Sequence, residues 1–329
     1  MRLTRFFLPA VYLLTVLIGA ASLVTCTGCA PSAEQKAEVP DDRESPPPQP
    51  VEPVEAEPSA VPGVPAEPRE AGVPGDVAAE GVVFAASALK SIAAQPDGMP
   101  PAPDVSVFAP VDDLADQADR YVAGLEKALE GEDAFEYIQE KIGREANTLV
   151  IIALALGLHD EPNRYKDRAG ALMQTAAELA AATDLETAKR RVVAVREAAD
   201  GKLKSDLELR WGPAASLKEL MLQVPLVNTR LKRNLQGERF KTRAKLTAGY
   251  TAVIAAIAQG SMADVSEAKT PEQVKQWFDF SVAMRDAAGA LNAAVRQGDE
   301  AAGAGAMKKL AQSCNDCHAV FHPEAEVED

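Results

Sequence analysis

The chain has 329 residues, of which 34 are basic and 49 acidic, so its formal net charge is −15. This balance argues against nucleic acid as a partner, because nucleic-acid binding needs a basic face, and it suits a basic protein or a small ligand. Aromatic residues make up only 5%, and abundant alanine and leucine favour helix over sheet. We therefore expect an all-α protein.

The first 29 residues are typical of an export signal. Arg2 and Arg5 precede an apolar stretch at residues 6–24. The sequence CTGCA at 26–30 resembles a bacterial lipobox and predicts lipidation at Cys29, with Cys26 or plain cleavage as alternatives. An uncleaved transmembrane anchor is a further alternative, because the stretch is long enough to span a bilayer. Each alternative places the rest of the chain outside the cytoplasm, and lipidation tethers it to a membrane on the periplasmic side.

Residues 30–105 are expected to form a linker. The stretch 31–75 is rich in Pro, Glu, Ala and Val and has no aromatic residue, so it cannot bury a core and is predicted to be disordered and extended. One short helix is expected within 76–95, followed by coil at 96–110. The linker would connect the membrane to the folded part of the chain.

From residue 111 the pattern is helical and contains an internal repeat. Three segments of the first half match three of the second half in the same order, namely 125–131 with 231–237, 150–157 with 253–260, and 167–172 with 286–291. Three ordered matches favour duplication over chance similarity of helices rich in alanine and leucine. We expect two tandem four-helix bundles with up-down-up-down topology, at residues 106–204 and 205–325.

Capping signals predict the helix boundaries. In the first half the helices are expected at 111–130, 133–157, 162–181 and 184–204, the last starting at a Thr183/Glu186 capping box. In the second half, Ser216 and Glu219 begin a helix that Pro225 kinks and Gly237 ends. The next helix is expected at 238–259, with Gly260 as its C-cap. The last two are expected from Thr270 to Gly298 and from Asp299 through a cysteine pair.

That cysteine pair belongs to the sequence CNDCH at residues 314–318, a C-x-x-C-H motif. Two thiols one helical turn apart can add to the two vinyl groups of haem, and His318 then lies under the iron as its proximal ligand. A redox-active C-x-x-C pair or half of a metal site is the alternative. The first would need a βαβ context, and the second lacks further Cys or His residues. The motif therefore predicts one covalent haem c, attached through Cys314 and Cys317.

The position of the motif on the last expected helix resembles the cytochrome c′ family, also called class II cytochromes c. The resemblance covers about residues 207–325 and includes Phe321, three residues after the histidine. His322 stands where the family usually has Arg or Lys, so it is either a titratable neighbour of the iron or a solvated residue at the end of the helix. The first half lacks the cysteines and is expected to be a haem-less bundle.

The resemblance also implies that the helix starting at Ser216 crosses the distal face of the haem. Met221 on this helix is the candidate distal iron ligand, and Ala115 occupies its place in the haem-less half when Gly237 is aligned with Gly131. Flexible core filling is the alternative role for Met221. His159 is expected to cap a helix end or to face solvent.

The occupancy of the sixth coordination position of the iron decides between two functions. With Met221 bound, the protein would be an electron-transfer cytochrome with a low-spin haem. Without it, a five-coordinate iron would bind or sense NO or CO. An enzymatic role is not expected, because no catalytic set of side chains stands out in the sequence. The expected partners are a redox protein with a basic docking face and either a second copy or, inside the chain, the haem-less half.

Overall fold

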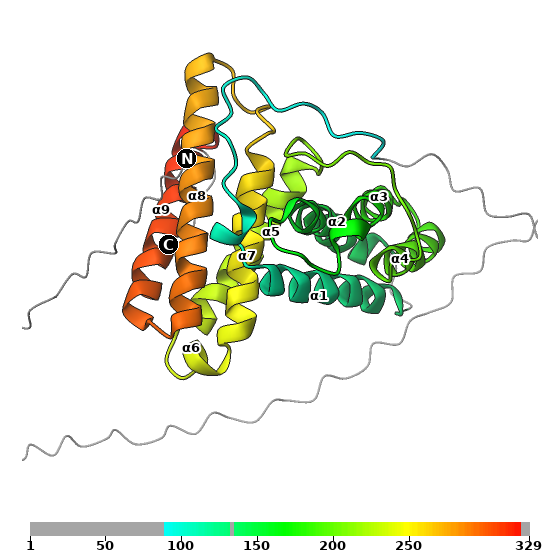
Figure 1. Cartoon of the computed structure of the whole chain (residues 1–329), viewed down its shortest axis with the longest axis horizontal. Helices are drawn as coiled ribbons and strands as arrows, with labels where there is room; N and C mark the ends of the chain where they lie inside the picture. Colours follow the sequence, from blue (N-terminus) through cyan, green and yellow to red (C-terminus); the bar gives the residue numbers. More distant parts are fainter. Residues whose placement is uncertain (1–88, 132–134, 324–329) are drawn as a thin grey trace, which may run out of the picture. The chain divides into compact units, whose positions relative to one another are not determined.

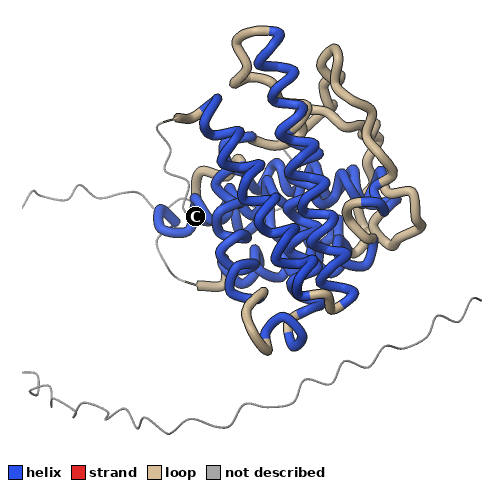
Figure 2. Tube along the Cα trace, turned by 90° about the vertical axis from the view of Figure 1, so that its left-hand side faces the viewer, coloured by secondary structure: helices blue, strands red, loops and turns tan. Residues whose placement is uncertain are grey.

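The computed structural model describes residues 89–131 and 135–323, and all regular secondary structure in these ranges is helical (Figures 1 and 2). The expected all-α class is thereby confirmed. The export signal, with Cys26 and Cys29, and most of the expected linker lie outside the described residues. Among the helices in these two ranges, none combines the length and hydrophobicity needed to cross a membrane.

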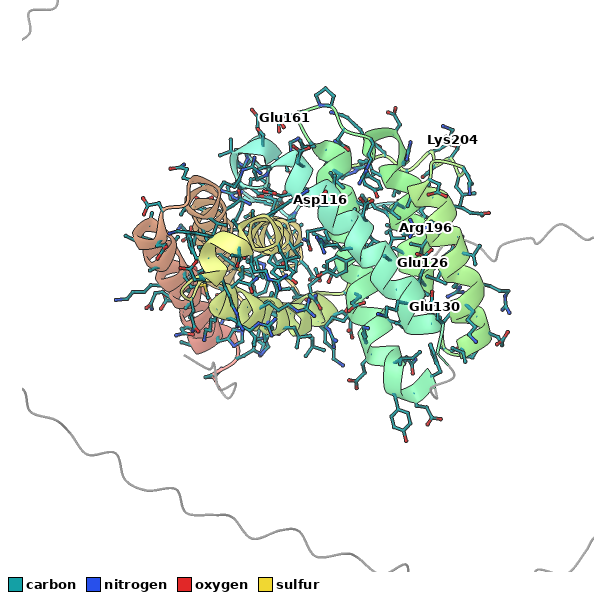
Figure 3. All side chains as sticks on the ribbon, turned by 90° about the horizontal axis from the view of Figure 1, so that it is seen from below. Asp116, Glu126, Glu130, Glu161, Arg196 and Lys204 are labelled. Carbon is teal, nitrogen blue, oxygen red and sulfur yellow. The ribbon has the colours of Figure 1, made fainter. Side chains whose placement is uncertain are left out.

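Four long helices make up the first half of the described chain: α1 (Val111–Leu129), α2 (Phe135–Leu158), α3 (Ala169–Ala180) and α4 (Leu185–Ala199). Each packs against the next in the chain, and α4 packs back against α1, so the four close into a ring. Arg196 on α4 donates two hydrogen bonds to the Glu126 carboxylate on α1 (Figure 3). These bonds lower the pKa of Glu126 and fasten the last helix to the first.

The second half contains α5 (Leu217–Asn234), the short α6 (Arg239–Thr242), α7 (Ala244–Ser261), α8 (Pro271–Gln297) and α9 (Glu300–Phe321). Here α7 packs between α5 and α8, and α8 packs against α9. Among the described helices, however, α5 and α9 are not a closely packed pair, although they correspond to α1 and α4 of the first half. The second ring is therefore open between its first and last helices.

Most predicted helix starts in the second half are confirmed. Ser216, Thr270 and Asp299 are the N-caps of α5, α8 and α9, and each side chain accepts a hydrogen bond from the backbone amide three residues later. Gly298 ends α8 with φ of 72°, the left-handed conformation that glycine adopts without strain. These signals are local, and therefore the sequence carries them directly.

The expected helix at 238–259 differs from the structure in two ways. The chain forms α6, breaks at Arg243, and only then starts α7. Gly260 is not a C-cap, because α7 continues to Ser261. A Cβ atom at Gly260 would lie 2.8 Å from Cδ1 of Ile151 on α2, so this glycine lets the two helices approach closely. The need for a glycine at position 260 is therefore explained by packing between the halves and not by helix termination.

Two helices of the first half start elsewhere than predicted. The N-cap of α4 is Asp184, whose side chain accepts from the Thr187 amide, so the Thr183/Glu186 capping box is wrong by one residue. The helix expected from 162 begins at Ala169, after a 3-10 turn at Lys166–Arg168. Asn163 bonds the Leu156 carbonyl instead and holds the preceding loop in a turn. The expected end at 204 is also too late, because α4 stops at Ala199, two residues before Gly201 with φ of 78°.

The last part of the expected linker packs onto the helices. Residues 89–95 are not helical, while the rest of the helix expected at 76–95 lies outside the described residues. Ile92 is buried, and Gln174 on α3 donates a hydrogen bond to the Leu89 carbonyl. From about residue 89 the chain is thus bound to the fold, whereas the linker was expected to continue to residue 105.

The two halves share one hydrophobic core and a buried polar network. The main contacts between the halves join α7 to both α1 and α2, and α5 to α2. Asp113 on α1 accepts hydrogen bonds from Asn292 and Arg296 on α8 at 2.9 and 3.0 Å. Gln223 on α5 donates to the Tyr121 hydroxyl of α1 at 2.6 Å, and burial raises the pKa of this tyrosine. The interface therefore resembles a domain interior.

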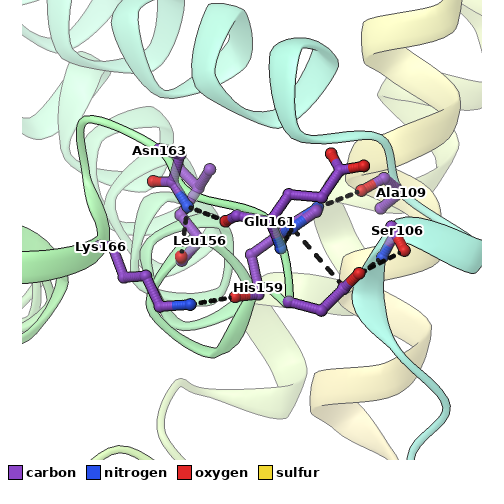
Figure 4. A network of polar contacts seen from close by, with 8 residues as sticks. Ser106, Ala109, Leu156, His159, Glu161, Asn163 and Lys166 are labelled. Carbon is purple, nitrogen blue, oxygen red and sulfur yellow. Dashed lines mark hydrogen bonds and ion pairs between the residues drawn. The ribbon is translucent and has the colours of Figure 1, made fainter.

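His159 fastens the segment before α1 to the end of α2 (Figure 4). It is fully buried, so the expectation that it faces solvent is wrong. Its Nδ1 accepts from the Glu161 amide at 3.0 Å, which leaves Nε2 to donate to the Ala109 carbonyl at 3.1 Å. Beside it, Asp160 accepts from the backbone amide and the hydroxyl of Ser106 at 2.9 and 2.6 Å.

The Ser106–Asp160 pair predicts a pH-dependent contribution to stability. The two hydrogen bonds from Ser106 lower the pKa of Asp160 to about 2, below its value of roughly 3.9 in an unfolded chain. The stabilisation is therefore full above pH 4 and is lost as the pH falls towards 2. Ser106→Ala should lower the urea midpoint at pH 7 and change it little near pH 2. An equal loss at both pH values would contradict this assignment.

Candidate functional site

A cavity of about 620 Å³ lies among α5, α7, α8 and α9 in the second half. Its size falls within the range of roughly 300–1,000 Å³ that is typical of cofactor sites. All four helices contribute side chains to the wall. The lining residues are Met221, Val224, Pro225, Asn228, Thr229, Lys232, Ala258, Ser261, Trp277, Phe280, Ser281, Met284, Ser313, Cys314, Cys317 and His318.

The wall formed by α9 contains the whole C-x-x-C-H motif. Cys314 and Cys317 are one helical turn apart, both are free thiols, and both are partly buried. Burial raises the pKa of the Cys314 thiol, and burial together with the neighbouring Cys314 raises that of Cys317 to about 11. At neutral pH both side chains are thus protonated thiols that face a common cavity.

His318 lines the same cavity one residue further along α9. Its buried Nδ1 has no hydrogen-bond partner. Burial, with a smaller contribution from His322, lowers the pKa of His318 and favours the neutral imidazole that metal coordination requires. The His322 ring lies 5.9 Å from the His318 ring, centroid to centroid, and its backbone amide donates to the His318 carbonyl. His322 is therefore a direct neighbour of the candidate ligand.

Aromatic side chains support the motif. Phe321 contacts Trp277 and Phe280 edge to face, with centroid separations of 5.2 and 6.4 Å. The Trp277 indole donates to the Ser261 carbonyl at 3.3 Å. Since Trp277 and Phe280 also line the cavity, the end of α9 is attached to α8 by the rings that form the cavity wall.

On α5, Met221, Pro225 and Asn228 line the cavity at helical spacing. Met221 packs against a small apolar cluster of Leu217, Met262, Trp277 and Phe278, and Cys317 packs against the same cluster. Because Pro225 has no N–H, the carbonyl of Met221 loses its usual intrahelical partner. The buried Oδ1 of Asn228 has no partner either. The α5 wall thus combines a thioether with unpaired oxygen acceptors.

The structure brings together the residues singled out in the sequence and adds others. Cys314, Cys317, His318 and Met221 line one cavity, whereas Phe321 and His322 support it from outside. The sequence did not identify four other residues that line the cavity, namely Trp277, Phe280, Met284 and Asn228. Tryptophan is rare in this chain, which was a usable signal for Trp277, although the other tryptophan, Trp211, belongs to the main core. No local pattern distinguishes Met284 or Asn228 from ordinary helical residues.

The glycines of the 301–306 segment do not line the cavity. A Cβ atom at Gly303 would lie 3.0 Å from the Phe240 ring of α6, and one at Gly305 would contact nothing within 4 Å. Gly303 therefore leaves room on α9 for the Phe240 side chain. In the described ranges, no group of three or more His, Cys, Asp or Glu side chains is arranged to hold a metal ion.

Comparisons of the chain with protein-family models, with curated proteins and with solved structures found no match.

Proposed function

We propose that this protein is an exported c-type cytochrome that carries one covalent haem and transfers electrons. The observation that carries the proposal is the shared cavity, in which both thiols and the imidazole of C-x-x-C-H lie on one helix and a methionine lies on another. An isolated C-x-x-C-H sequence could occur by chance, but an apolar cavity directly at the motif supports a cofactor.

The residues present fit haem in three respects. The cavity is of cofactor size and is lined largely by apolar and aromatic side chains. The His318 imidazole is favoured in its neutral form, and its buried Nδ1 is unpaired. The opening between α5 and α9 provides space that their counterparts α1 and α4 fill by direct packing. These features support a flat group held between two helices.

Each residue then has a distinct role. Cys314 and Cys317 would hold the macrocycle through thioether bonds, and His318 would bind the iron on the proximal side. Met221 is the candidate distal ligand, and Trp277 and Phe280 would exclude water from the cavity. The bound haem would supply an iron centre that changes between the ferric and ferrous states. His322 beside His318 adds a titratable group to its surroundings.

Binding of NO or CO is a second candidate function, favoured by Asn228. Its unpaired buried amide lies on the same helix as Met221, two turns away, and faces the same cavity. An amide side chain can hydrogen-bond a small ligand at the iron. If Met221 only fills space, a five-coordinate iron with this polar group nearby would suit a gas-binding protein.

The Met221→Ala variant distinguishes the two functions. For an electron carrier with Met221 bound, we expect the ferrous parent to be low-spin and the variant to become high-spin and bind carbon monoxide readily. Absorption spectra of both redox states provide the measurement. Met307→Ala is the matched control, because Met307 is a partly buried α9 residue that does not line the cavity. Identical spectra for the parent and Met221→Ala would exclude Met221 as the ligand.

The wider organisation is also part of the proposal. The helix contacts support two tandem up-down-up-down bundles, a haem-less one at 106–204 and a haem-binding one at 205–325 that resembles cytochrome c′. The sequence of residues 1–29 supports export and a lipid anchor at Cys29 that holds the protein on the periplasmic side of a membrane. Within the chain, the haem-less bundle is then the partner of the haem-binding bundle, as in an internal pseudo-dimer.

A further inference from the structure

The side of α5 that faces away from the core is exposed along its whole length. Its middle is apolar, with Leu222 and Leu226 at 48% and 41% exposure. Positive charges lie at both ends. We name this surface the outer α5 face, and its exposed residues are Lys218, Leu222, Pro225, Leu226, Thr229, Arg230 and Arg233.

The outer α5 face borders the cavity. Pro225 and Thr229 line the cavity wall and are exposed as well, so the surface and the cavity meet at these two residues. Any protein bound to this face would come within one side-chain layer of the proposed haem. The site of docking and the site of electron exchange would then coincide.

The charge of this region is opposite to that of the whole chain. Residues 216–250 contain eight lysines and arginines but only two glutamates, a net charge of +6, whereas the chain carries −15. Lys241 and Lys245 are paired with Glu300 and Asp116 on other helices. On the outer α5 face itself, Arg230 lies over the Tyr250 ring at 5.7 Å, and its charge opposes the rise in pKa that burial causes at Glu145 on α2. This one carboxylate offsets only part of the positive charge that Lys218, Arg230 and Arg233 place on the face.

We infer that the outer α5 face is a docking site for an acidic protein surface. An apolar centre with a charged rim is the usual organisation of a protein interface, and local charge steers the approach of a partner more than net charge does. The purpose of this docking site rests on the proposed electron-transfer function. The net charge of the chain predicts a partner with a basic docking face, whereas the local charge of α5 favours a partner with an acidic one. The partner is a redox protein with carboxylates around an apolar patch.

A second copy of the chain fits this face less well. A twofold antiparallel pairing centred between Leu222 and Leu226 places Lys218 of one copy against Arg230 of the other. The two like-charge contacts oppose self-association. A different protein with carboxylates at both ends of its patch has no such conflict.

The test compares two triple charge reversals in the full-length protein. One is Lys218→Glu/Arg230→Glu/Arg233→Glu on the outer α5 face. The matched control is Lys127→Glu/Arg190→Glu/Lys204→Glu, which changes the net charge equally at exposed positions of the first half. The binding probe is a fluorescein-labelled peptide of glutamate and leucine, followed by anisotropy at low and high salt.

We expect the parent and the control to bind the peptide at low salt and the α5 variant to bind about tenfold more weakly or worse. High salt should abolish the difference. Equal binding by both variants would overturn the inference. So would α5-dependent binding to vesicles of phosphatidylglycerol and phosphatidylcholine without peptide binding, or an α5-dependent dimer in solution, since the face would then serve lipid or a second copy.

A kinetic measurement connects the face to electron exchange. Ferricyanide, an anion, takes one electron from the ferrous protein and becomes ferrocyanide, leaving ferric iron. Its rate at low salt should fall about tenfold or more in the α5 variant and stay within twofold in the control. Equal rates in the two variants would contradict docking at the electron-exchange site. Peptide binding needs no haem, so failure of the docking face is distinguishable from failure of the proposed function.

Discussion

Cys314→Ala/Cys317→Ala should yield protein without covalently bound haem. Both thiols line the cavity beside His318, and no other described cysteine can replace them. Two thioether bonds are needed for the usual attachment, so the content of covalent haem should fall from about one per chain to background. Haem staining of denaturing gels and the pyridine haemochrome spectrum of the purified protein provide the measurements.

The matched control for this experiment is Ser313→Ala. Ser313 lines the same cavity next to Cys314; its hydroxyl donates to the Leu310 carbonyl within α9 and also contacts the Cys314 thiol, but it supplies no thiol for attachment. This variant should keep its haem. A double cysteine variant that retains covalent haem, or a parent that carries none when it is produced with a functional haem-attachment system, would refute the cytochrome assignment.

Asp113→Ala should cause a large loss of stability although Asp113 lies outside the cavity. Asp113 is buried and accepts hydrogen bonds from Asn292, which is also buried, and from the half-exposed Arg296. Removing the carboxylate leaves both donors without this acceptor and should cost about 2–3 kcal/mol, because bonds to charged groups are the stronger ones. Urea unfolding followed by circular dichroism at 222 nm measures this loss.

The neighbouring Asp112 is the control for this prediction. It lies on the same turn of α1 but is exposed, and exposed substitutions usually change stability by less than about 0.5 kcal/mol. Asp112→Ala should therefore leave the urea midpoint nearly unchanged. If the two variants were equally stable, the polar network between α1 and α8 would not hold the halves together.

Local signals predicted much of the fold. Caps such as Thr270 and Asp299, and the glycine at 298, act within one turn of helix, so the sequence alone located both ends of α8 and the start of α9. The repeat matches also lie in or directly next to corresponding helices, α1 with α5, α2 with α7, and α3 with α8. The C-x-x-C-H motif identified one wall of the cavity for the same reason, since its spacing is a property of a single helix.

What the sequence could not predict depends on contacts between distant segments. Gly260 has the position of a helix cap, yet its role is set by Ile151, more than a hundred residues away in the chain. His159 could not be identified as buried without the segment around Ala109 that covers it. Met284 and Asn228 belong to the site only because α8 and α5 pack around the cavity, and this packing cannot be read from either helix alone. The net charge likewise concealed the basic surface of α5.

The open ring of the second half has a consequence for the order of assembly. Among the described helices, α9 packs closely only against α8, while α4 in the first half is held by both α3 and α1. A helix with one close neighbour can open without disturbing the others, and we expect α9 to be the last segment to become protected from hydrogen exchange. Its cysteines would stay accessible to an attachment enzyme while the remainder of the chain is already folded. If the proposed haem is attached there, closure of the cavity around it would be the final folding step, and molecules that carry haem would be more resistant to proteases than molecules without it.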